Sequence, residues 1–117
     1  GNAAGNNYIR KFYGSARGGR IVDMKASRTA EMYLIRAEAY AKLATPNITA
    51  GSNDLNTLRT IRIQGYTPVS FTGAQELITA VLDERFKELC FEGFRLFDLK
   101  RNNLPVERNA SDVTASA

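Results

Sequence analysis

The chain has 117 residues, of which 44% are hydrophobic and 24% are charged, as in an ordinary globular domain. No apolar run approaches the roughly 20 residues of a membrane-spanning helix, and the formal net charge of +4 comes without a nucleic-acid-binding motif. The absence of histidine excludes Ser-His-Asp and Cys-His catalysis and histidine-ligated metal sites, and we expect no cofactor. Because basic residues beyond the first quarter alternate with acids, as on a solvated face, we also expect no nucleic-acid partner.

The first part of the chain, residues 1–26, contains most of the glycines and is predicted to be an irregular lead-in. Runs of β-like composition at residues 8–13 and 21–24 allow a short β-hairpin within it. The opening residues have neither the basic nor the apolar segment of a signal peptide, so we expect any export signal to lie upstream.

A helix over about residues 27–44 is the clearest predicted element. Its apolar side chains follow the helical period, at Ala30, Tyr33, Leu34, Ala37, Tyr40, Ala41 and Ala44. Ser27 is the expected N-cap, and Pro46 prevents extension of the helix. Tyr33 and Tyr40 share one face, which favours core packing over a stacking platform for a ligand.

A second, shorter helix is predicted from about Asn53 to Ile63. The segment before it, TPNITAGSN, has the composition of a connection. Leu55, Leu58 and either Ile61 or Arg62 then recur at helical spacing. The first two helices should therefore form a hairpin.

A third, long helix is predicted to begin at a capping box formed by Thr72 and Gln75. The pattern continues to Phe91, before Gly93 interrupts it. The inner face of this helix is expected to carry Leu77, Ile78, Val81, Leu82, Arg85, Phe86 and Leu89.

The expected fold class is mainly all-α, with a helix hairpin and a third long helix. A short helical piece, FRLFDLKR, follows the third helix, and residues 102–117 have the composition of a polar tail. We therefore expect a lead-in of residues 1–26, a helical region of residues 27–101 and a tail.

Glu84, Glu88 and Glu92 are spaced four apart, so a continuous helix would place their carboxylates in one row. One interpretation is a glycosidase in which two of these acids act on a sugar, although such acids must face each other across the substrate. The favoured interpretation is structural, with bidentate ion pairs to arginines of other helices. The arginines available for this role are Arg28, Arg59, Arg62, Arg85 and Arg95.

Two acids of the first helix, Glu31 and Glu38, are also expected to have arginine partners. Glu38 lies at the border of the apolar stripe, where a carboxylate is stable only when it is paired. We expect its arginine to come from the second or third helix. The single cysteine, Cys90, lies between apolar residues and is expected to be an inert buried thiol.

Tyr66 and Phe71 lie in a polar loop between the second and third helices. An exposed ring there would suit the stacking of a sugar, so these two residues are the candidate ligand contacts. The alternative is a loop that is held in place by its own aromatic side chains.

Three blocks of the sequence resemble the C-terminal region of the SusD/RagB family of outer-membrane nutrient-binding lipoproteins. They are RTAEMYLIRAEAYAKL, DLNTLRTIR and ELITAVLDERFKELCFEGFRLFDLKR, in this order and at this spacing. The resemblance covers about residues 20–105. It implies tetratricopeptide-like helix pairs that form a scaffold.

The resemblance also implies a function without catalysis. Such proteins are lipid-anchored at the cell surface and deliver glycans or other nutrients to a SusC-like TonB-dependent transporter. Members are several times longer and carry an N-terminal anchor cysteine, a role that Cys90 cannot fill from a helical position. The chain is therefore expected to be a piece of a longer protein that can self-associate through an uncovered apolar face.

In the family, the charged signature belongs to the scaffold rather than to the ligand site. The matching positions in this chain are Arg28, Glu31, Glu38, Arg59, Glu84, Arg85, Glu88, Glu92, Arg95 and Asp98. No catalytic residue and no metal ligand is expected among them. The alternative function is a tetratricopeptide-like module that binds a protein partner, and the glycosidase is the third.

Overall fold

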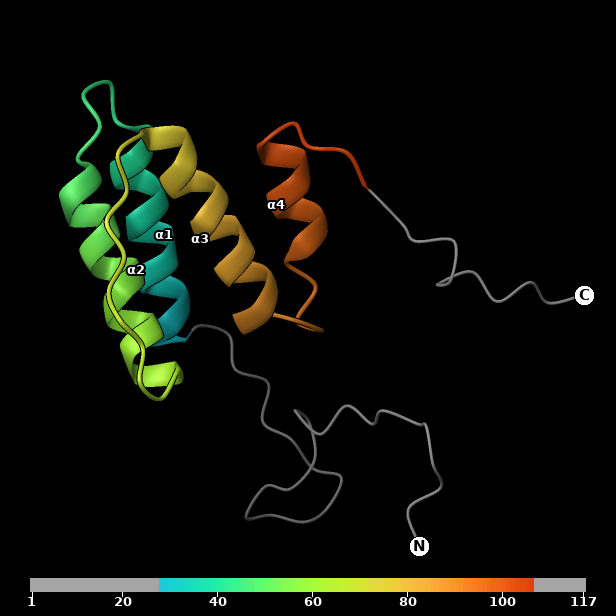
Figure 1. The fold of residues 1–117 in the computed structure, drawn as a ribbon. Helices are drawn as coiled ribbons and strands as arrows, with labels where there is room; N and C mark the ends of the chain where they lie inside the picture. The colour runs from blue at the N-terminus through green and yellow to red at the C-terminus, as the bar shows by residue number, and fades with distance from the viewer. Residues whose placement is uncertain (1–27, 107–117) are drawn as a thin grey trace, which may run out of the picture.

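Residues 28–106 are described by a computed structural model, in which they form four helices and no strand (Figure 1). The helices are α1 (Thr29–Lys42), α2 (Ile48–Arg62), α3 (Ala74–Glu88) and α4 (Arg95–Arg101). The mainly all-α prediction is confirmed. The predicted hairpin of the lead-in and the proposed N-cap Ser27 lie outside the described residues.

The first three helices form the body of the structure. Helix α1 contacts both α2 and α3, and α4 packs beside α3 with its last turn reaching α1 (Figure 1). Helices α1 and α2 form the predicted hairpin, and α3 adds a third layer in a tetratricopeptide-like arrangement. The lower end in Figure 1 brings together the start of α1 and the ends of α2 and α3.

The core lies between α1, α2 and α3. It consists of aliphatic side chains that are almost fully buried, namely Ala30, Leu34, Ala37, Ala41, Leu55, Leu58, Leu77 and Val81. Burial of each leucine contributes about 1.5–3 kcal/mol. The predicted stripe of the first helix is confirmed except at Ala44, which is exposed, while Tyr33 and Tyr40 are half-buried.

Helix α2 begins at Ile48, so the predicted start at Asn53 is wrong. The Asn47 side chain caps the helix by accepting a hydrogen bond from the Ala50 N–H at 3.1 Å. Gly51 lies inside α2, where any larger residue would place a Cβ 2.7 Å from Leu77 Cδ2. A residue that is typical of turns thus serves close helix packing.

Helix α3 begins at Ala74, one residue later than a cap at Thr72 would place it, and its N-cap is Gly73. Glu76, rather than the predicted Gln75, accepts hydrogen bonds from the Thr72 N–H at 3.1 Å and the Thr72 hydroxyl at 3.2 Å. Glu76 bonds the residue before the N-cap, and the N-cap glycine has no side chain to bond in return, so the predicted capping box does not form.

The same helix ends at Glu88, before the predicted end at Phe91. Phe91 and Gly93 have left-handed backbones, with φ of 65° and 84°, and these reverse the chain into α4. Phe86, predicted to face inward, is 48% exposed and lies beside Arg95 at the start of α4. Ile61 of α2 is exposed as well.

Candidate functional site

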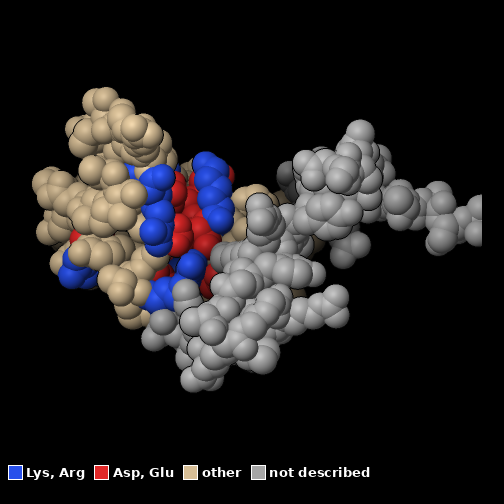
Figure 2. All heavy atoms as spheres, turned by 90° about the horizontal axis from the view of Figure 1, so that it is seen from below, with Lys and Arg blue, Asp and Glu red and all other residues tan. Residues whose placement is uncertain are grey.

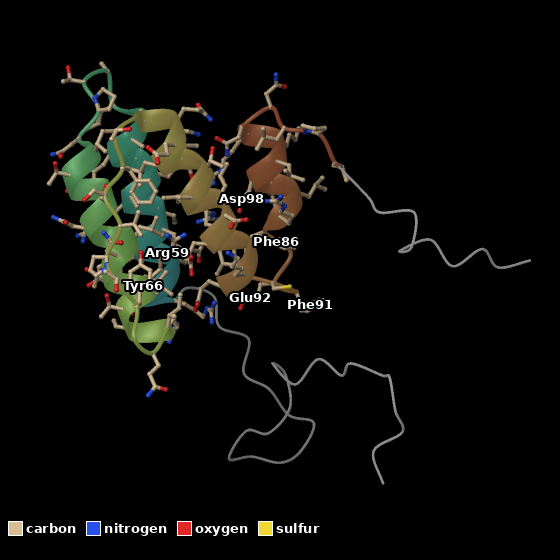
Figure 3. The ribbon with its side chains drawn as sticks, in the orientation of Figure 1. Arg59, Tyr66, Phe86, Phe91, Glu92 and Asp98 are labelled. Atoms are coloured by element: carbon tan, nitrogen blue, oxygen red, sulfur yellow. The ribbon has the colours of Figure 1, made fainter. Side chains whose placement is uncertain are left out.

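The most deeply buried acid of α3, Glu84, pairs with an arginine of α2. Arg59 Nε lies 2.7 Å from Glu84 Oε2, and the Tyr66 side chain lies beside the same guanidinium (Figure 3). Burial alone would lower the pKa of Arg59, but the neighbouring Tyr66 and Glu84 side chains outweigh it and raise the pKa. Arg59 is therefore a permanent cation between α2, α3 and the loop.

A second group of charges closes the lower end of the bundle. Arg62 holds Glu88 with two hydrogen bonds, of 2.9 and 3.1 Å. Arg28 lies 3.2 Å from Glu88 and 3.3 Å from Glu92, and it donates to the Glu88 carbonyl at 2.7 Å. Seen from below, acidic side chains lie between basic ones on this face (Figure 2). Arg28 thus caps the end of α3, where the helix dipole favours a cation.

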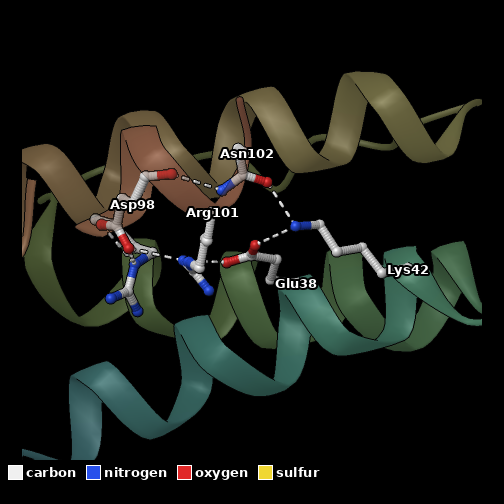
Figure 4. Close-up of polar contacts among 6 residues, drawn as sticks. Glu38, Lys42, Asp98, Arg101 and Asn102 are labelled. Atoms are coloured by element: carbon white, nitrogen blue, oxygen red, sulfur yellow. Dashed lines mark hydrogen bonds and ion pairs between the residues drawn. The ribbon is translucent and has the colours of Figure 1, made fainter. Parts of the chain in front are cut away.

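The third group joins α1, α3 and α4 (Figure 4). Arg85 Nε lies 2.9 Å from Asp98 Oδ2, and both side chains are only 4% exposed. Arg101 Nη2 lies 2.7 Å from Asp98 Oδ1 and 2.7 Å from Glu38 Oε2. Lys42 Nζ completes the chain at 2.8 Å from Glu38 Oε1. Glu38 therefore has an arginine partner from α4, and its predicted origin in the second or third helix is wrong.

The predicted row of three carboxylates is interrupted. Glu84 and Glu88 lie on α3, whereas Glu92 lies in the turn after it. Both helical acids are occupied by arginines, so neither is placed to act on a glycosidic bond. This arrangement ties helices together and has no evident catalytic chemistry.

Three predicted site residues differ from expectation. Arg95 forms no ion pair among the described residues, and its guanidinium instead lies 4.9 Å from the centre of the Phe86 ring. Glu31 is buried and has no ion pair within residues 28–106. Cys90 is half-buried rather than enclosed in the core.

The loop aromatics Tyr66 and Phe71 are both engaged by the protein itself. The Tyr66 hydroxyl donates to Asn56 Oδ1 at 2.7 Å, and Asn56 also bonds the backbone N–H and carbonyl of Val69. Phe71 is half-buried against the core. These contacts are those expected of a loop held by its own aromatic rings, and sugar stacking on Tyr66 and Phe71 stays a prediction.

Several residues that take part in these ion pairs and hydrogen bonds were not predicted, among them Arg101, Lys42 and Asn56. Arg36 and Asp54 were missed too, although they form a bidentate pair with both distances at 2.7 Å. The hydrogen bond to Asp54 raises the pKa of Arg36. Asp54 directly precedes the buried Leu55, so its place beside the apolar stripe was a usable signal for a partnered acid.

A hollow lies where α3 turns into α4, at the end marked by Phe86 and Phe91 in Figure 3. We call it the α3–α4 hollow; its volume is about 300 Å³, and Arg85, Arg95 and Leu96 also line it. A second hollow of about 290 Å³ lies between α3 and the end of α4, beside Lys42 and Asn102. Both hollows are lined by residues of α3 and α4.

Within residues 28–106 no group of acids and Cys90 is arranged to hold a metal ion. None of the helices described there has the length and apolar character needed to cross a bilayer. In comparisons with known proteins, the SusD family profile matches residues 4–115. No curated protein and no solved structure matches the chain.

Proposed function

Because the chain belongs to the SusD family, we propose that it is part of a cell-surface protein that binds glycans or related nutrients without catalysis. We propose further that this protein is lipid-anchored in the outer membrane and delivers its ligand to a SusC-like TonB-dependent transporter. The observation that carries the proposal is the family match over residues 4–115 of a chain of 117.

The charge networks support a binding scaffold over an enzyme. Glu84 and Glu88, the two acids of the glycosidase alternative, are both occupied by arginines. Their ion pairs connect α1, α2 and α3, and the pairs of Asp98 connect α3 and α4. Rigid support of this kind suits a protein whose ligand is held by surface loops and hollows.

A glycan array followed by a hydrolysis assay tests the binding role. We expect the protein to retain specific glycans on the array and to release no product from them. Hydrolysis that disappears in a folded Glu84→Gln or Glu88→Gln variant would contradict the proposal and favour the glycosidase. Circular dichroism checks that each variant is folded.

Transfer to a transporter is tested by purification from outer membranes. An affinity-tagged protein containing this chain should copurify with a TonB-dependent transporter of the SusC type. Its recovery without any such transporter, under conditions that preserve other outer-membrane complexes, would contradict this part of the proposal.

Exposed apolar side chains favour a protein-binding module as the second candidate. Phe91, Leu96 and Phe97 are 62%, 61% and 69% exposed on the turn and α4. Replacement of Phe97 by serine separates the two functions, because Phe97 does not line the α3–α4 hollow. Loss of a protein complex or of self-association in ultracentrifugation, with glycan binding unchanged, would identify this surface as a protein contact.

A further inference from the structure

The α3–α4 hollow carries positive charge that the described residues do not balance. Arg85 is only 4% exposed and uses Nε on Asp98, but its buried Nη1 has no hydrogen-bond partner within residues 28–106. Arg95 lines the same hollow and forms no ion pair there. This nitrogen has almost no accessible surface, so an anion in the hollow would meet the charge of Arg85 through space rather than by a direct hydrogen bond.

The one acid among the described lining residues, Asp98, is already in use. Both of its oxygens accept from Arg85, and Oδ1 also accepts from Arg101. It therefore cannot neutralise Arg95 as well. The hollow is left with a net positive charge, because two arginines lie beside a single, shared carboxylate.

Apolar rings complete the hollow. Phe91 is 62% exposed at its rim, and its left-handed backbone is unfavourable for a bulky residue. The Phe86 ring lies under Arg95. Figure 3 shows both rings at the end of α3 next to α4. The volume of about 300 Å³ is at the lower end of the range for small-molecule sites.

We propose that the α3–α4 hollow binds an acidic sugar, with its carboxylate on Arg95, near the buried charge of Arg85, and its ring against Phe91. A planar carboxylate matches the fork of a guanidinium, and the apolar face of a sugar ring matches an exposed aromatic ring. The choice of a sugar rests on the proposed function, whereas the choice of a carboxylate rests on the two arginines.

Isothermal titration calorimetry of the 117-residue chain with three probes tests this site. Digalacturonate carries ring and charge, its methyl ester carries the ring without the charge, and acetate carries the charge without the ring. We expect digalacturonate to bind about 10- to 100-fold more tightly than either of the others, as one hydrogen-bonded ion pair would allow.

The variant Arg95→Gln should weaken digalacturonate binding by about 10- to 100-fold. Lys100→Gln is the matched control, because it removes one positive charge from the same helix outside the hollow and should change the affinity less than about 2-fold. The variant Phe91→Leu should weaken binding of digalacturonate while its affinity for acetate stays unchanged. Thermal melts establish that all three variants fold.

Four outcomes would overturn the inference. They are equal binding of the acid and its ester, equal binding of acetate and digalacturonate, equal effects of Arg95→Gln and Lys100→Gln, and no binding of digalacturonate at about 10 mM. Specific binding of neutral glycans alone would overturn this site and leave the proposed function intact. Failure of the proposed function would instead appear as an absence of any glycan binding on the array.

Discussion

The body of α1, α2 and α3 and the last helix, α4, are held by different forces. The body encloses aliphatic side chains, of which Leu34, Leu55 and Leu77 are fully buried. Helix α4 buries Leu99 but points Leu96 and Phe97 outward, and it is joined to α3 and α1 mainly by the ion pairs of Asp98 and Arg101. Apolar burial thus builds the fold, whereas charge pairing positions α4 and leaves the hollow beside it.

The largest effect is expected from a cavity in the body. Leu34→Ala should lower the free energy of unfolding by about 2–5 kcal/mol, because the site is fully enclosed between three helices. Urea denaturation followed by circular dichroism measures this loss. Ile35→Ala on the exposed face of α1 is the control, and a similar loss there would contradict the assigned core.

The next effect comes from the pair that attaches α4. Asp98→Asn leaves the Arg85 guanidinium buried without a counter-charge, which costs up to about 3 kcal/mol. Helix α4 can detach and rehydrate Arg85, so we expect loss of hydrogen-exchange protection in residues 95–101 before α1 is affected. Simultaneous loss in α1 and α4 would show that the two regions are one cooperative unit.

A smaller effect should follow from crowding the body. Gly51→Ala places a Cβ 2.7 Å from Leu77 Cδ2 and 3.0 Å from the Ala37 carbonyl. The clash outweighs the better helix propensity of alanine, so we expect a net loss of about 1–2 kcal/mol in urea denaturation. Gly73→Ala is the control, since nothing lies within 4 Å of a Cβ there. Equal stability of the two variants would mean that α1 and α2 can separate.

The smallest effect is expected at the exposed edge of the network. Arg62→Gln should cost about 0–1 kcal/mol and lose its effect in high salt, because Arg62 is half exposed. The hydrogen bond to Glu88 raises the pKa of Arg62. The pair therefore contributes fully to the free energy of unfolding below the ordinary pKa of arginine, and this contribution is lost only as the pH rises through the raised pKa. Denaturation at pH 6 and pH 9 should therefore give the same cost, and a cost that differs between them would contradict this assignment.

Local patterns predicted the helices well but some of their ends poorly. The period of α1 was readable because its apolar residues face the body along the whole helix. The start of α2 was missed because Gly51 and Ser52 are common in turns, and only the neighbouring Leu77 and Ala37 explain a glycine inside the helix. The end of α3 was missed because Phe91 adopts a backbone conformation that its side chain disfavours.

The sequence by itself determined the helical class and the family, because helical period and the order of three motif blocks are properties of the chain alone. It also indicated that the acids of α3 needed cations. Only the tertiary structure decided which cation each acid meets: Glu38 pairs with Arg101, 63 residues away, and Arg95 remains outside the network beside Phe86. The reason is that ion pairing depends on the distance and orientation of packed helices, which no local pattern encodes.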